Sequence, residues 1–359
     1  MARRSSFQWL RHLRSLLRKR RKMAGFTLIE LLVAMIIGSI IVVLLLSLVI
    51  QLTEVNARDA GRSQVQQDMQ TALDFINDDL REAVFVYNGQ CLAGTGIPTS
   101  STNYSTVCPG IANYIPAAMN SATRRPVLAF WRTDPLPVGI DNLCRTSASA
   151  IADGSADPLL QTVCIAGSTY SLVVYAIDTD TTDTDWQGEA QIYRYKLSQF
   201  ADNATTVTEN TGYARPQVGA FLQWPFEIDE TGTVVDARNG SPNNPAQVLV
   251  DFVDNGTTAG AVTVTPSCDE FGSDAEIRAD SLSPSTGALS SFYACVRGGG
   301  IPRPTNPPRE NQDGRNQDVL VTLVGSTSGL SSFSRGGDNA SRLSPIQTRT
   351  LVRGILQKK

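Results

Sequence analysis

Residues 25–50 read GFTLIELLVAMIIGSIIVVLLLSLVI, and this stretch decides how the chain is organised. The twenty residues from Leu31 to Ile50 contain no charged side chain. A helix of that length is about 30 Å long, which is the thickness of the hydrocarbon core of a membrane. A carboxylate, Glu30, stands at its start, and charged groups are costly in a membrane. The sequence predicts a membrane-spanning helix whose one acidic residue needs an explanation.

The residues before this stretch are strongly basic. Residues 1–25 hold nine lysines and arginines and no acidic residue, which leaves 22 basic and 34 acidic residues in the rest of the chain. Because positively charged flanks stay in the cytoplasm, the amino terminus is expected there and the bulk of the chain outside. The acidic remainder repels phosphate groups, so nucleic acid is not expected as a partner.

A secretory signal peptide is the alternative explanation of the same pattern. Such a peptide is cut after its apolar region, at a site where two small residues flank one residue of any type. The residues after Ile50 read QLTEVNARDAGRSQ, and Ala57–Gly61 is a poor match to such a site. The apolar run also exceeds the roughly 7–15 residues that are typical of a signal peptide. The segment is therefore expected to stay in the mature protein.

The ten residues from Gly25 to Ala34, GFTLIELLVA, resemble the prepilin signature of type IV pilins and of the pseudopilins of type II secretion. The resemblance implies that a prepilin peptidase cuts between Gly25 and Phe26 and methylates the new amino terminus on Phe26. The match is uninterrupted and follows a basic leader, although this leader is longer than that of many pilins. The resemblance also implies two further partners, namely other pilins or pseudopilins, bound through the helix, and the inner-membrane assembly platform.

Within this resemblance Glu30 is the fifth residue of the processed chain and acts in assembly. Cleavage creates a free amino group on Phe26, and Glu30 of one subunit can then meet the charged terminus of its neighbour. An ion pair in a medium of low dielectric is strong when each charge would otherwise be unpaired. The alternative is that Glu30 lies at the membrane surface and reaches water.

The apolar pattern continues past the membrane segment as one face of a helix. Its members recur at spacings of three and four: Val65, Met69, Ala72, Leu73, Ile76, Leu80, Ala83 and Val84. The pattern predicts one helix from Phe26 to about Val84, membrane-embedded over 26–50 and amphipathic over 51–87. Residues 69–85, MQTALDFINDDLREAVF, resemble the same region of large minor pilins of the PilW type and of J-type pseudopilins. The long leader and large head also resemble the pseudopilins of cyanobacterial polysaccharide secretion in hormogonia.

Beyond Tyr87 the sequence becomes rich in glycine, proline, serine and threonine, with short apolar runs between them. Six runs rich in β-branched and aromatic residues are predicted strands: Val127–Arg132, Ser171–Ile177, Ala190–Leu197, Ala246–Val253, Ser290–Arg297 and Val319–Val324. A helix followed by antiparallel strands is an α+β pattern, which agrees with the pilin fold of a long helix against a sheet. We therefore expect a leader at 1–25 and a β-rich head at 88–359, with loop insertions near 92–125, 135–168 and 298–316.

All six cysteines fall in the part of the chain expected outside the cytoplasm: Cys91, Cys108, Cys144, Cys164, Cys268 and Cys295. Disulfides persist there, and an even count favours bridges. Six cysteines allow 15 pairings. Pairing by sequence neighbours is the simplest of them, with Cys91–Cys108, Cys144–Cys164 and Cys268–Cys295. Each such bridge closes a short loop and contributes about 3 kcal/mol. No C-x-x-C spacing indicates a zinc site.

The sequence offers little for catalysis. The chain has one histidine, His12, which lies in the leader, so the processed chain lacks an imidazole for a Ser-His-Asp or Cys-His arrangement. It also lacks the phosphate-binding loop of an ATPase. We therefore expect a protein that is not an enzyme and that needs no cofactor.

One acidic cluster is a weak candidate for Ca²⁺. Asp178, Asp180, Asp183 and Asp185 could supply carboxylate oxygens, which are the ligands that calcium prefers. The EF-hand pattern fails, because its required glycine falls on Asp183. A solvated loop between two strands is the favoured interpretation.

These patterns lead to one functional hypothesis and one rival. The hypothesis is a minor pilin or pseudopilin, a single-pass inner-membrane protein whose head lies in the periplasm until it joins a pilus or secretion pseudopilus, and so reaches the cell surface in a pilus. A bulky head packs badly in a repeating shaft, which favours a place near the filament tip and a role in assembly, motility or secretion. The rival is a membrane-anchored extracytoplasmic adhesin or binding domain that enters no filament.

Overall fold

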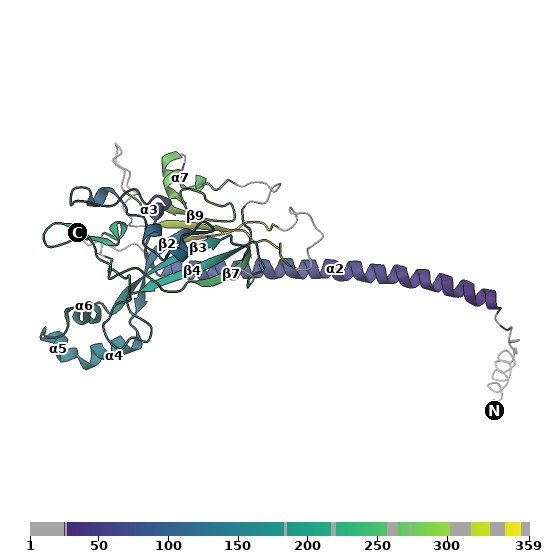
Figure 1. Cartoon of the computed structure of the whole chain (residues 1–359), viewed down its shortest axis with the longest axis horizontal. Coiled ribbons are helices and arrows are strands. Elements are labelled where there is room, and N and C mark those ends of the chain that lie inside the picture. The colour runs from purple at the N-terminus through teal and green to yellow at the C-terminus, as the bar shows by residue number, and fades with distance from the viewer. Residues whose placement is uncertain are drawn as a thin grey trace, which may run out of the picture. The chain divides into compact units, whose positions relative to one another are not determined.

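The structure is a computed structural model that describes residues 25, 27–182, 185–216, 220–256, 265–272, 275–301, 317–330 and 342–352. The chain divides into two compact units, Met1–Ala57 and Arg58–Lys359. Helix α2, Leu28–Arg81, contributes to both units (Figure 1). Within the described residues, all the strands belong to the second unit, which is therefore the β-rich head.

Two antiparallel sheets form the frame of the head (Figure 1). The five-stranded sheet has the order β1, β2, β3, β4 and β7, with bounds Ala83–Val86, Arg124–Pro135, Ser168–Asp178, Ala190–Ser198 and Gln247–Val253. The four-stranded sheet has the order β11, β10, β9 and β8, with bounds Ile346–Leu351, Asp318–Leu323, Phe292–Arg297 and Leu282–Ser283. A small hairpin adds β5, Phe226–Ile228, and β6, Val234–Asp236. All six predicted strands are confirmed, and so is the α+β class.

Short helices fill the connections between strands. The α-helices are α3, α4, α5, α6 and α7, at Gly89–Ala93, Val138–Thr146, Ala148–Ala152, Pro158–Ala166 and Ala275–Ser281. Single 3-10 turns are η1 to η5, at Tyr104–Thr106, Ile111–Asn113, Ala117–Met119, Phe221–Gln223 and Asp269–Phe271. The insertions expected at 92–125 and 135–168 are thus partly helical. Most of the third, 298–316, lies outside the described residues.

The second half of α2 supplies the apolar face that the sequence predicts. Its buried apolar residues are Val65, Met69, Ala72, Leu73, Ile76 and Leu80. The predicted end of the helix was wrong, because α2 stops at Arg81 and the residues after Glu82 form β1. Ala83 and Val84 fit both a helical stripe and a strand, and no proline or glycine marks the change. Pairing of β1 with β2 decides between the two, as tertiary contacts often override local propensity.

The five-stranded sheet is buried on both faces. Successive side chains of a strand point to opposite faces, so Phe130 and Tyr175 pack with α2 and the four-stranded sheet. Trp131 and Tyr195 face the other way, against the loops that follow β1 and β4. An irregularity in β2 between Pro126 and Leu128 shifts this alternation.

Contacts between the sheets include one at each end of β10. The side-chain amide of Gln317 accepts the N–H of Val86 at 2.7 Å and donates to its carbonyl oxygen at 2.5 Å. Gln317 therefore pairs with the outer edge of β1 as a backbone peptide group would. At the other end, Val253 of β7 forms a bridge with Gly325. A side chain at Gly325 would come within 3.0 Å of Met69 and Val65 on α2, so the close approach of the helix requires this glycine.

A buried carboxylate fixes α2 to the five-stranded sheet. Asp79 is 5% exposed and lies between two arginines of the sheet. Its oxygens accept Arg132 Nη1 at 2.5 Å, Arg194 Nε at 2.8 Å and the Tyr175 hydroxyl at 2.6 Å. Burial and the adjacent Asp79 charge raise the pKa of Tyr175, which keeps the phenol a donor. Because each donor comes from a different strand, one carboxylate sets the position of the helix across β2, β3 and β4.

The connection between β2 and β3 forms a separate small lobe of α4, α5 and α6. Asp157 caps α6 by accepting the N–H groups of Leu159 and Leu160, and Gly167 ends the helix in the left-handed conformation. The core of the lobe is small, with Ile140, Val163 and Phe200 as its buried residues. Its two long helices are also joined by the disulfide Cys144–Cys164.

We predict that Asp79→Ala lowers the free energy of unfolding by about 2–3 kcal/mol, because it leaves the partly buried Arg194 and the Tyr175 hydroxyl without their acceptor, whereas Arg132 keeps two other carboxylates. The measurement is urea unfolding of the detergent-solubilised protein, followed by tryptophan fluorescence. The matched control is Asp78→Ala, which removes an exposed carboxylate that lies 3.5 Å from Arg81 and is expected to cost under about 1 kcal/mol. Equal losses in the two variants would contradict the role given to Asp79.

We also predict that the lobe unfolds locally when its disulfide is removed. In a Cys144→Ser, Cys164→Ser variant, amides of α4 and α6 should lose protection from hydrogen exchange while those of β2 and β3 keep it. The comparison is a Cys91→Ser, Cys108→Ser variant, since both of these cysteines are fully buried in the main core. That variant should lower the stability of the whole head. Loss of protection throughout the head in both variants would contradict the separate lobe.

Candidate functional site

The candidate processing segment lies at the start of α2. The carbonyl oxygen of Thr27 accepts the N–H groups of Glu30 at 3.0 Å and Leu31 at 3.2 Å. The Thr27 hydroxyl also accepts the N–H of Glu30, at 3.3 Å. Thr27 and Glu30 have the spacing of a capping box, which favours a helix start at this point. Gly25 is exposed, whereas Phe26 lies outside the described residues.

The carboxylate of Glu30 is exposed and has no hydrogen bond or ion pair within the described residues. Its neighbours Leu28 and Ile29 are 86% and 70% exposed. Among the described residues, nothing stabilises a charge at this position. The position therefore suits a charged partner from outside the chain, in surroundings of low dielectric.

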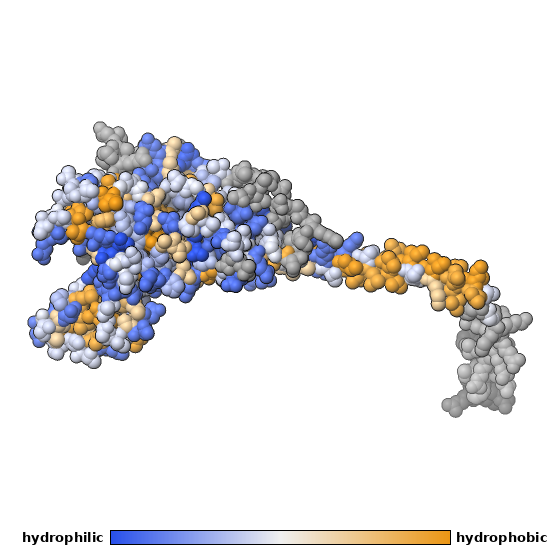
Figure 2. Space-filling view, viewed as in Figure 1, coloured by the Kyte–Doolittle hydropathy of each residue, from blue (hydrophilic) through white to orange (hydrophobic). Residues whose placement is uncertain are grey.

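The side chains of the apolar segment after Glu30 are exposed within the described part of the chain. This helix is long and apolar enough to cross a membrane, and its apolar stretch contains no buried residue. Figure 2 shows its surface as a nearly continuous hydrophobic band. The hydroxyls of Ser39 and Ser47 donate to the carbonyl oxygens of Ile36 and Leu44, each at 2.8 Å, which satisfies them without water. These features are consistent with anchoring in a membrane.

The glycines of this segment are not required by packing within the chain. A Cβ atom added at Gly25 or at Gly38 would have no atom within 4 Å. Packing against the described residues therefore places no constraint on Gly25. A substitution at Gly25 can therefore test recognition by another protein without a clash in the described structure.

The three disulfides pair each cysteine with its neighbour in the sequence. They are Cys91–Cys108, Cys144–Cys164 and Cys268–Cys295, with Cα–Cα distances of 5.3, 5.4 and 5.6 Å. The first holds α3 to the loop before η2, and the third holds the turn η5 to β9. They stabilise connections rather than strands, because the sheets are already held by their hydrogen bonds.

The acidic cluster after β3 is divided by its contacts. Asp178 forms an ion pair with Arg124 at 2.7 Å and accepts the N–H of Asp180. Asp180 in turn accepts the N–H and hydroxyl of Thr182, while Asp183 lies outside the described residues. Among the residues that the structure describes, no three His, Cys, Asp or Glu side chains gather as metal ligands. These hydrogen bonds fit a capped turn.

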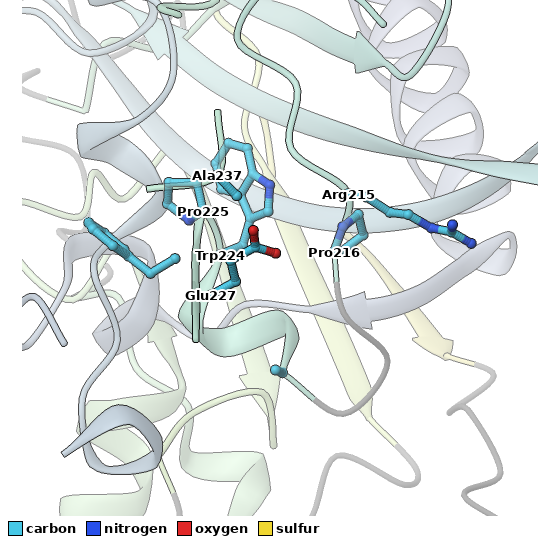
Figure 3. A pocket seen from close by; sticks show the side chains of 8 residues that line it. Arg215, Pro216, Trp224, Pro225, Glu227 and Ala237 are labelled. Carbon is cyan, nitrogen blue, oxygen red and sulfur yellow. The ribbon is translucent and has the colours of Figure 1, made fainter. Parts of the chain in front are cut away.

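A small pocket lies beside Trp224 (Figure 3). Its volume is about 10 Å³, close to the minimum for one water molecule. Glu227 lies near the indole, and the guanidinium of Arg215 points away from it. A pocket of this size cannot hold a substrate or cofactor.

Sequence analysis missed the buried cluster around Asp79. One signal was present, since Asp79 follows Ile76 by three residues and so falls on the apolar face of the helix. A charged residue at such a position is normally paired. Its partners Arg132 and Arg194 belong to predicted strands, but nothing in the sequence brings them together.

Comparison with known proteins gives one match. Residues 20–46 match the model of the prokaryotic N-terminal methylation motif. This match covers the end of the basic leader, Gly25 with Phe26, Glu30 and most of the apolar segment. No curated protein and no solved structure matches the chain. The chain therefore carries, at the start of a long helix followed by an antiparallel β head, the processing motif that supports a place among the type IV pilin-like proteins.

Proposed function

We propose that this chain is a minor pilin or pseudopilin, a structural subunit of a type IV pilus or of a filament related to type II secretion. The observation that carries the proposal is the matched methylation motif placed directly before an exposed, membrane-length apolar helix. A disulfide-bonded head follows that helix, which suits an environment outside the cytoplasm. We propose no enzymatic activity and no cofactor.

The first step of the proposal is processing by a prepilin peptidase. The basic leader keeps residues 1–25 in the cytoplasm, where the peptidase cuts between Gly25 and Phe26 and methylates Phe26. The hydrogen bonds of Thr27 to Glu30 start the helix immediately after the cut. The processed subunit then waits in the inner membrane on the segment 26–50.

The second step is assembly through the exposed helix. Glu30 of one subunit pairs with the amino terminus of its neighbour, which satisfies a carboxylate that has no partner within the described residues of its own chain. The surrounding apolar side chains exchange lipid for the helices of other subunits. Because the pair forms in one register, it fixes the stagger between subunits.

The head favours a place near the filament tip. Its lobe of α4–α6 and its long connections enlarge it beyond a helix and one sheet. Such a head would interrupt the regular packing of a shaft. We propose large minor pilins of the PilW type and J-type pseudopilins as its group, on the resemblance at residues 69–85, with the pseudopilins of cyanobacterial polysaccharide secretion as a narrower candidate group. The head would lie in the periplasm before assembly, on the inner-membrane platform.

We predict that the mature chain begins at N-methylated Phe26 in cells that contain the prepilin peptidase and at Met1 in cells that lack it. The measurement is mass spectrometry of the membrane-extracted protein. Gly25→Val should block the cut without disturbing the fold, because a side chain there meets nothing in the structure.

Gly38→Ala is the control for this test, since it adds a side chain to equally open space in the same helix and should leave processing unchanged. A chain that still begins near Met1 in the presence of the peptidase would reject the proposal. It would leave a membrane-anchored adhesin or binding domain outside any filament.

We predict that Glu30→Ala leaves cleavage intact but removes the subunit from sheared filaments, because the neighbour's amino terminus loses its partner. Immunoblots of the sheared and membrane fractions measure this distribution. Asp68→Ala, an exposed acidic position on the same helix, should enter filaments normally. Normal incorporation of the Glu30 variant would reject the assembly role.

A further inference from the structure

A solvent-open groove of about 480 Å³ lies where β2 begins. This volume falls within the range of small-molecule sites, roughly 300–1,000 Å³. Its polar lining consists of Asn113, Asn120, Ser121, Arg125 and Thr286, and the rest is alanine, leucine, proline and glycine. The groove lies in the head, so its function does not depend on the proposed assembly through Glu30.

Two walls of the groove are fixed to each other. The disulfide Cys91–Cys108 joins the segment that leads into Ala93 to the segment that leads into Asn113. A side chain at Gly110 would lie 2.4 Å from the carbonyl oxygen of Ala93, so the two backbones are in direct contact. The amide of Asn120 donates to the carbonyl oxygen of Ala112 at 2.9 Å. These walls are therefore formed before any ligand arrives.

The third wall is the loop that follows β8. The buried hydroxyl of Ser283 donates to the carbonyl oxygen of Val127 at 2.6 Å, which holds the start of the loop on β2. Gly89 of α3 approaches Leu282 so closely that an added Cβ would lie 1.7 Å from its carbonyl oxygen. The loop is thus held by both the sheet and α3.

Arg125 is the one charged side chain among the residues that line the groove. Its Nη1 donates to the carbonyl oxygen of Gly287 at 3.1 Å, which orients the exposed guanidinium. Gly287 has φ +65°, and a side chain there would lie 2.9 Å from Nη1. The guanidinium therefore lies directly over this glycine. It gives the groove a single positive charge on a chain that is acidic after its leader.

The amides of the lining provide acceptors beside this cation. Asn113 and Asn120 each use the side-chain nitrogen to donate to a backbone carbonyl, of Pro109 and Ala112 respectively. Their side-chain oxygens remain as acceptors, which match the hydroxyl groups of a ligand. A planar guanidinium matches a carboxylate, with which it forms strong charge-assisted hydrogen bonds. The apolar lining suits the C–H faces of a ring.

We propose that this groove binds a hydroxylated carboxylate of the size of a sugar acid, with the carboxylate on Arg125 and hydroxyls on Asn113 and Asn120. One cation neutralises one carboxylate but only half of a phosphate dianion. The acceptor oxygens of the two asparagines also favour hydroxyl donors over a second anion. The same unit can come from a free sugar acid or from an acidic polysaccharide.

The test is calorimetric titration of the full, detergent-solubilised protein with D-glucuronate, D-glucose and glucose 6-phosphate. D-glucuronate should bind at least about tenfold more tightly than D-glucose, because only glucuronate offers the carboxylate. Arg125→Gln should remove this preference, whereas Arg145→Gln, which changes an exposed arginine in the lobe, should keep it. Equal binding of glucuronate and glucose, or tighter binding of the phosphate, would overturn the proposal.

A second variant distinguishes a loss of binding from a loss of folding. Ala112→Trp fills the groove but keeps Arg125 in the chain, so it should weaken glucuronate binding while the unfolding midpoint stays unchanged. Unaltered binding by that variant would place the ligand elsewhere and overturn the assignment. Glucuronate oligomers then distinguish the sources, since tighter binding of an oligomer indicates a polysaccharide and equal binding indicates the free acid.

Discussion

The buried carboxylate of Asp79 is the constraint on which the head depends. It lies on the apolar face of α2, and its two oxygens are shared by donors from β2, β3 and β4. Apolar packing alone would allow the helix to slide or rotate over the sheet, since it is not directional. Directional, charge-assisted bonds to three strands select one placement.

The two halves of α2 lie in different surroundings. Its second half buries an apolar stripe from Val65 to Leu80 in the head, and this surface is already satisfied by the chain itself. Its first half exposes apolar side chains on all sides, and the carboxylate at its start has no partner among the residues that the structure describes. The second half of α2 is therefore covered by its own chain, whereas the apolar side chains of the first half stay exposed. That difference is what a subunit needs if it is to fold alone and then associate.

Much of this arrangement could be predicted from the sequence, because its signals are local. Six of the seven strands with at least six residues are marked by β-branched and aromatic residues, and the apolar stripe of α2 is marked by its spacing. The short strands β5 and β6 have only three residues each, too few for a periodic signal. The lobe was expected as a loop insertion, although Asp157, Pro158 and Gly167 mark the ends of α6. The Asp79 cluster and the Arg125 groove could not be foreseen, since each assembles from segments that are distant in the sequence.

The side chain of Gln317 affects how the head can associate with copies of itself. By pairing its side chain with Val86, it occupies the N–H and carbonyl groups at the end of β1, which is an edge strand of the larger sheet. At the opposite edge of that sheet, Val253 of β7 forms a bridge with Gly325. Unpaired edge strands can pair with strands of other molecules in any register, which leads to aggregation. Contacts at the end of each edge strand of the larger sheet lower this risk, and the exposed amino-terminal helix is the surface that we propose for ordered association.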